Sequence, residues 1–149
     1  NTTIAGTLGV TGAATFTGGA IVTGTLEAQE IREVVSNVTI SSNIATCVWT
    51  AGNIYYIGTA PGANFTVNVT GVPTDNNYML SVNVAVVQGT TGYIPNAFQI
   101  DGVAQTIKWS GGTAPTPTSS SGKIDFFNFT MHRLNAGTWN IYAASSLNF

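Results

Sequence analysis

The sequence predicts an all-β protein, in which a short N-terminal trimeric β-repeat shaft is followed by an antiparallel β-sandwich head. Three observations lead to this prediction. Glycines recur every six residues near the N-terminus, short runs of alternating apolar and polar residues fill the rest, and turn-forming residues separate those runs. Alternation is typical of half-buried strands, and closely spaced short strands are typical of sandwiches and barrels.

The first element is a hexapeptide repeat. Its glycines are Gly6, Gly12, Gly18 and Gly24, and an apolar residue stands two positions before each of them. A period of six is a multiple of the strand period of two and does not match the 3.6 residues of a helical turn. Two further apolar residues, Leu8 and Leu26, stand two positions after a glycine. We assign both sets to the axis of the shaft: Ile4, Leu8, Val10, Phe16, Val22 and Leu26.

One chain is too short to bury this repeat by itself. Residues 4–28 would complete little more than one coil of a β-helix, and a solenoid needs about three repeats before it encloses a core. Three identical chains can share the apolar row around one axis, so we expect a homotrimeric shaft. The alternative is an irregular linker rich in Gly and Thr.

Charged residues first appear where the repeat ends, and they mark a neck. These residues are Glu27, Glu30, Arg32 and Glu33. The spacing of Ala28, Ile31 and Val35 also allows one or two helical turns, so the neck could be a short trimeric coil. We place the shaft and neck at residues 1–33 and the head at residues 34–149.

The head is expected to consist of short strands without helices beside them. The expected strands are Val34–Ile40, Ile44–Thr50, Asn53–Thr59, Asn64–Thr70, Tyr78–Gln88, Ala97–Ile100, Val103–Trp109, Lys123–Leu134 and Thr138–Ser145. Turn signals separate these runs at the spacing typical of a β-sandwich.

Two places within these strands carry more specific expectations. Asp101-Gly102 predicts a two-residue hairpin turn, because glycine tolerates the positive φ that such turns require. Phe126-Phe127 interrupts the alternation of its strand, which predicts either a β-bulge or a strand that is apolar on both faces. In the second case, one of the two faces would pack against a neighbouring subunit.

Composition excludes several classes of function. Charged residues make up 7% of the chain, against about 25% in ordinary soluble domains, and the net charge is −2. The cations Arg32, Lys108, Lys123 and Arg133 form no run, so no nucleic-acid partner is expected. Apolar stretches fall far short of the roughly 20 residues of a membrane span, so no membrane insertion is expected. The single Cys47 is interpreted as a buried thiol.

The titratable residues do not indicate an enzyme or a cofactor. Acid–base and nucleophilic catalysis need clustered groups, whereas this chain has one histidine and six scattered carboxylates. Asp75, Asp101 and Asp125 lie in or beside expected turns, which disfavours a glycan-cleaving pair. His132 is interpreted as an ordinary strand residue, and the alternative is a metal ion shared by three copies of His132 on the trimer axis.

Several segments carry a resemblance to a known group of proteins. They are residues 63–70, 72–74, 94–109, 111–112 and 114–116, and the most specific block is Asp101–Trp109. Across residues 50–145 the chain resembles the C-terminal region of fibre and structural virion proteins of tailed phages, especially those of marine bacteria. The resemblance implies a trimeric fibre tip on the virion surface, with host attachment as its role. It implies no catalytic residues.

Two loops could bind a receptor, because neither the core nor the expected turns explain their residues. Residues 88–93 present Tyr93 on a loop that contains Gly89 and Gly92, and residues 109–122 are rich in Gly, Thr, Pro and Ser. The candidate receptor-binding residues, which offer the aromatic, amide and hydroxyl groups that sugars require, are Tyr93, Asn96, Trp109, Ser110 and Thr113.

The sequence thus predicts a non-enzymatic homotrimeric adhesin that attaches a virion to a host-surface glycan or protein, and that joins other virion proteins through a longer parent chain. Three copies would add avidity to weak individual sites. The alternative is a capsid decoration protein or another purely structural virion protein.

Overall fold

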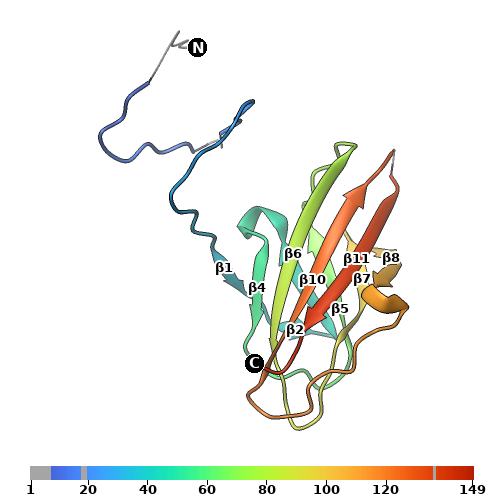
Figure 1. Cartoon of the computed structure of the whole chain (residues 1–149). Helices are drawn as coiled ribbons and strands as arrows, with labels where there is room; N and C mark the ends of the chain where they lie inside the picture. The colour runs from blue at the N-terminus through green and yellow to red at the C-terminus, as the bar shows by residue number, and fades with distance from the viewer. Residues whose placement is uncertain (1–7, 18–19, 136) are drawn as a thin grey trace. The chain divides into compact units, whose positions relative to one another are not determined.

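The computed structural model describes residues 8–17, 20–135 and 137–149. Contacts within the chain divide it into two units, Asn1–Ile31 and Arg32–Phe149. The second unit is the head, and it consists of two β-sheets with two short 3-10 helices, η1 (Trp49–Ala51) and η2 (Ser110–Gly112) (Figure 1). The predicted all-β sandwich class is therefore confirmed.

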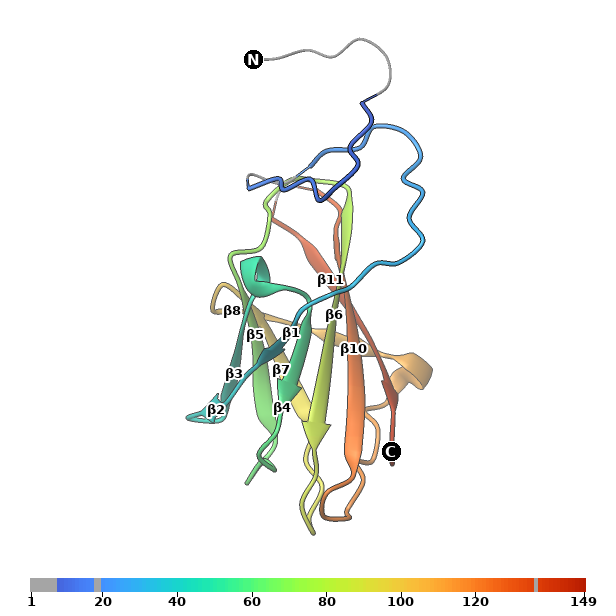
Figure 2. The ribbon, with the colours of Figure 1, turned by 90° about the vertical axis from the view of Figure 1, so that its left-hand side faces the viewer.

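The two sheets form the layers of the sandwich (Figure 2). The six-stranded sheet has the order β1 (Val35–Asn37), β4 (Ile54–Ile57), β6 (Tyr78–Val87), β10 (Ile124–Arg133), β11 (Trp139–Ser146) and β9 (Ile107–Trp109). The five-stranded sheet has the order β2 (Ile40–Ser41), β3 (Ile44–Val48), β5 (Phe65–Thr70), β7 (Pro95–Ile100) and β8 (Val103–Gln105).

The head is a mixed sandwich, so the prediction of an antiparallel one was wrong. From β3 to β7 the chain places consecutive strands alternately in the two sheets. Strands that follow each other within one sheet, such as β3 and β5, β5 and β7, and β4 and β6, then run parallel. Alternation within a strand reports which face is buried but carries no information about the direction of its neighbours.

The antiparallel part of the head is formed by its three longest strands. β10 pairs with β6 from Ile124 to Arg133 and with β11 from Phe126 to Arg133, with no shift of register in either ladder. Of the two alternatives predicted at Phe126-Phe127, the β-bulge is therefore excluded. Phe127 points into the core, and Phe126 lies on the outer face of the sheet, where its side chain is 43% exposed.

Two of the expected strands are each divided between the two sheets. Val34–Ile40 contains β1 and the first residue of β2, and Val103–Trp109 contains β8 and β9. The turn before β8 confirms the predicted hairpin, because Ile100 pairs with Val103 across Asp101 and Gly102, whose φ angles are 48° and 81°. The Asp101 carboxylate also accepts a hydrogen bond from the Gly71 N–H at 2.7 Å.

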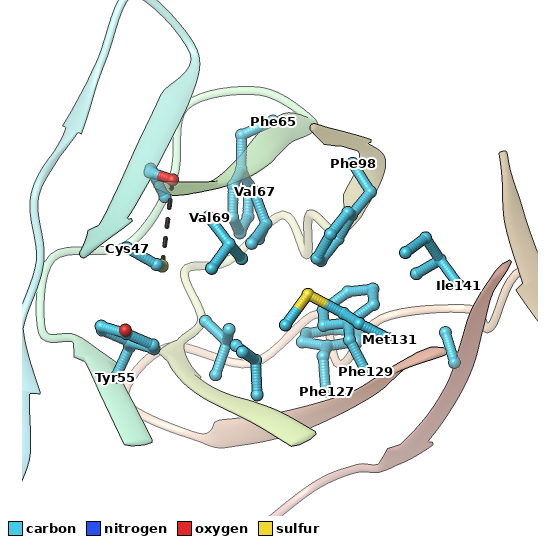
Figure 3. Packing of buried hydrophobic residues seen from close by; sticks show 14 of the residues in the cluster. Cys47, Tyr55, Phe65, Val67, Val69, Phe98, Phe127, Phe129, Met131 and Ile141 are labelled. Atoms are coloured by element: carbon cyan, nitrogen blue, oxygen red, sulfur yellow. Dashed lines mark hydrogen bonds between the residues drawn. The ribbon is translucent and has the colours of Figure 1, made fainter. Parts of the chain in front are cut away.

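The core lies between the sheets and is built from alternate residues of each long strand (Figure 3). Its largest fully buried apolar side chains are Tyr55, Phe65, Phe98, Phe127, Phe129, Ile57, Met131 and Ile141. The Phe98 and Phe129 rings meet across the two sheets with centroids 4.9 Å apart. Cys47 is fully buried, as predicted, and burial raises the pKa of its thiol to about 12.

The described part of the N-terminal repeat has no regular structure in the single chain. Among residues 8–17 and 20–34 there is no strand and no helical turn, so the helical neck does not form in one chain. The predicted axial residues of this part are all exposed, for example Phe16 at 65% and Leu26 at 67%. Ile4, also assigned to the axis, lies outside the described residues.

Candidate functional site

The candidate site is an open cleft beside η2, at the β9 edge of the six-stranded sheet. It consists of two adjoining hollows of about 440 Å³ and about 300 Å³ that share four lining residues. The shared residues are Trp109, Ser110, Ala143 and Ala144. Pairing between β9 and β11, in which Trp109 is the partner of Ala143, brings these two segments together.

The backbone of η2 shapes the larger hollow. Gly111 and Gly112 have φ angles of 76° and 81°, a left-handed conformation that residues with a side chain rarely adopt. The chain therefore turns sharply after β9, and residues 113–116 continue along the end of β11 to line the hollow with Thr113 and Thr116.

Trp109 closes the core at this edge and also forms a wall of the cleft. Its ring centroid lies 6.4 Å from that of Phe127 and 6.1 Å from that of Phe129, both fully buried. Most of the indole is therefore committed to packing, and the part that lines the cleft is held rigidly.

The smaller hollow lies on the outer face of the sheet. Alternation along β9, β10 and β11 places Lys108, Asn128, Thr130 and Tyr142 there together. The Lys108 Nζ lies 5.4 Å from the centre of the Tyr142 ring and donates a hydrogen bond to the Asn140 Oδ1 at 2.6 Å. Tyr142 is 42% exposed, so part of its ring is free to stack against a ligand.

A buried carboxylate holds the long loop that borders the cleft. Asp125 is fully buried, and its two oxygens accept hydrogen bonds from the Thr118 N–H at 2.9 Å and the Asn148 N–H at 3.0 Å. The loop after η2 and the C-terminal segment are thereby fixed to the start of β10. Asp125 has a structural role, and it is not among the residues that line the cleft.

The structure brings together three of the five residues predicted to bind a receptor. Trp109, Ser110 and Thr113 line the cleft. Tyr93 and Asn96 lie elsewhere, in the β6–β7 connection and at the start of β7. The backbone N–H and C=O of Tyr93 are both bonded to the side chain of Gln88, which is 99% buried, so this loop is organised around an internal amide.

Most residues of the smaller hollow were not predicted from the sequence. Tyr142 and Lys108 are 34 positions apart, and only the parallel pairing of β9 with β11 places them side by side. A local signal did exist in β10, where Asn128 and Thr130 occupy the face opposite Phe127 and Phe129.

The chemistry of the cleft is that of binding by hydrogen bonds and aromatic contact. Lys108 is the one charged residue among those that line either hollow. Within the described part of the chain, no group of three or more His, Cys, Asp and Glu residues gathers. The hydroxyls of Ser110 and Thr130 and the amide of Asn128 line the same hollow as Tyr142, and the Thr113 hydroxyl lies in the adjoining one.

A further hollow of about 370 Å³ lies at another place in the head, between the β2–β3 turn and the β4–β5 connection. Its lining includes Ile40, Ile57 and Pro61. Ser42 and Asn43, which also line it, have φ angles of 50° and 61°, as expected for a tight turn. It presents neither an aromatic ring nor a charged group, so the cleft beside η2 is the stronger candidate.

Comparison with known proteins gave no match to a family model, a curated protein or a solved structure. A search of the described residues for a helix long and apolar enough to cross a membrane found none.

Proposed function

We propose that this chain is the homotrimeric tip of a tailed-phage fibre, a non-enzymatic adhesin that attaches the virion to a host-surface glycan through the cleft beside η2. The observation that carries this proposal is the composition of the cleft. An exposed aromatic ring, five serine and threonine hydroxyls, an amide and one cation line two adjoining open hollows on a rigid sheet edge.

Sugars present ring C–H groups and many hydroxyls, so the groups that hold them are an aromatic face and hydrogen-bonding side chains. Tyr142 offers such a face, and Ser110, Thr113 and Asn128 offer the hydrogen bonds. Few charges surround these groups, which favours a partner recognised by shape and hydrogen bonds over one recognised by net charge.

A trimer compensates for the shallow, open form of the cleft. Linked sites gain a factor of about 10² to 10⁴ in overall affinity when all engage one surface. Three weak clefts on one fibre tip are therefore sufficient for firm attachment to a cell that displays the glycan in many copies.

The test is binding of the purified full chain to an array of bacterial surface polysaccharides. Tyr142→Ala is expected to weaken binding at least about tenfold, the equivalent of about 1.4 kcal/mol, because it removes the stacking surface. The matched control is Tyr78→Ala, since Tyr78 is a 54% exposed tyrosine at the start of β6, outside the cleft.

Equal binding by the two variants would rule out the cleft as the receptor site. If no glycan binds and the chain attaches only to protease-sensitive material on host cells, the receptor is a protein. The adhesin proposal fails if the chain binds neither, and display of the protein at capsid three-fold positions would then favour the decoration role.

A further inference from the structure

The two outer faces of the sandwich differ in chemistry. On the central strand of the five-stranded sheet, the outward residues Thr66, Asn68 and Thr70 are all polar. On the six-stranded sheet, a contiguous set of outward residues is apolar, and we call it the outer apolar patch. Its members are Val35, Ile54, Tyr56, Ala85, Val87, Ile124, Phe126 and Phe149.

Strand register makes this patch continuous. Tyr56, Ala85 and Phe126 form one row across β4, β6 and β10, because Tyr56 pairs with Ala85 and Ala85 pairs with Phe126. Phe149 pairs by two backbone hydrogen bonds with Ile124, and its ring packs edge-on against Phe126 with centroids 5.4 Å apart.

Gly58 keeps the Tyr56 ring on this face. A Cβ at Gly58 would come within 2.9 Å of the Tyr56 Cε1, so the ring occupies the space that a side chain at position 58 would need. The ring thus lies along the sheet surface and widens the patch toward the end of β4.

The patch contains no charged residue, and an amide pair borders it. Asn128 donates a hydrogen bond from Nδ2 to the Asn83 Oδ1 at 2.6 Å, between the patch and the cleft. A nucleic acid or an anionic lipid surface needs cations, which the patch does not offer. An identical uncharged patch from another copy can pack against it without burying an unpaired charge.

The covalent chain connects this patch to the proposed shaft. The exposed apolar residues Ile31, Val34 and Val35 lead from the neck into β1, and Val35 belongs to the patch. The four-residue step along the chain from Ile31 to Val35 covers at most about 14 Å. If three chains meet at the neck, their β1 strands therefore lie close to the shared axis. The edge of the patch at Val35 lies there with them.

We propose that the outer apolar patch is the surface through which the three heads pack against one another. This inference rests on the homotrimer of the proposed function and names the part of the head that completes it. The patch extends from β1 to Ile124 and Phe126 of β10, whereas the cleft extends from β9 to Asn128 and Thr130 of β10, so different parts of the same sheet face can serve association and binding.

The test compares the reactivity of cysteines introduced into the two outer faces of the full chain. Phe126→Cys places a thiol in the patch, and the control Ala104→Cys places one at an exposed position of β8 in the other sheet. Cys47 is fully buried, so the labelling rate with a maleimide reports the introduced thiol. We expect Phe126→Cys to react at least about tenfold more slowly than Ala104→Cys.

A measurement of solution mass on the same samples separates the possible results. A trimer with slow labelling only at position 126 supports the inference. A trimer in which both positions react rapidly overturns the interface and leaves the adhesin proposal in place. A monomer overturns both the interface and the proposed trimer.

A second variant tests the same surface if Phe126→Cys alters the fold. Val35→Glu changes an exposed residue at the edge of the sheet, where a single chain tolerates a charge. We expect it to raise the trimer dissociation constant at least about tenfold, and Ala104→Glu to leave it unchanged. Equal dissociation constants would overturn the interface.

Discussion

At the scale of single residues, the buried carboxylate of Asp125 stabilises the fold. It binds backbone groups and takes no part in the candidate site. It is fully buried and holds two backbone N–H groups from separate segments. Hydrogen bonds to charged groups are each worth about 1.5–3 kcal/mol, and unpaired buried donors are costly. Asp125 therefore fixes the loop that borders the cleft.

Replacing this carboxylate should destabilise the head. We expect Asp125→Ala to lower the free energy of unfolding by about 2–4 kcal/mol, because the Thr118 and Asn148 N–H groups lose their acceptor. Chemical denaturation followed by tryptophan fluorescence measures the change. Asp75→Ala, at an exposed loop position, is the control and should have little effect. Equal stability of the two variants would contradict this role.

Cys47 makes the stability of the head sensitive to alkaline pH. Burial raises the pKa of the folded thiol from 9.0 to about 12, so between these values the unfolded chain loses a proton that the folded chain keeps. The free energy of unfolding should therefore be steady below about pH 9 and fall from pH 9 to about 12.

The measurement is a series of denaturation curves across this pH range for wild type and Cys47→Ala. The variant should show a shallower decline, although Tyr55, whose pKa burial also raises to about 12, still contributes in both proteins. If the free energy of unfolding falls equally with pH in the two proteins, the Cys47 thiol does not cause the loss of stability at alkaline pH.

At the scale of elements, the sequence predicted the positions of the strands well and their neighbours poorly. Phe65, Val67 and Val69 alternate with polar residues, and that pattern fixes both the strand and its buried face. Local preferences also fixed the Asp101-Gly102 hairpin. These features depend on residues close together in the chain.

The parallel pairings depend instead on contacts between distant segments. Nothing in Val103–Trp109 indicates that its first half joins one sheet and its second half the other, beside β11. The loop residues of the cleft could be predicted from composition. Lys108 and Tyr142 could not, because only β-pairing between segments far apart in the chain brings them together.

At the scale of the whole molecule, the properties of one chain point to association. The repeat exposes its apolar residues, with Phe16 at 65% and Val22 at 51%, and the outer apolar patch of the head exposes Val35, Phe126 and Phe149. Exposed apolar surface of this kind marks interaction sites in soluble proteins. A homotrimer would bury both surfaces with one symmetric arrangement.

A charge placed on the proposed axis should weaken that assembly. Phe16→Asp would bring three carboxylates to an apolar axis at a cost of several kcal/mol, so the trimer should dissociate at a higher concentration than wild type. The matched control is Thr17→Asp, one position further along the repeat, where we expect the side chain to face outward. Sedimentation at a series of concentrations measures both, and equal dissociation would contradict the assigned register.

The mass of the wild-type assembly in solution tests the central claim most directly. Light scattering coupled to size-exclusion chromatography should give three times the 15.4 kDa of a single chain. A mass of 15.4 kDa at the micromolar concentrations of such a measurement would contradict the trimer, and with it the shaft, the packing of the heads and the gain in avidity.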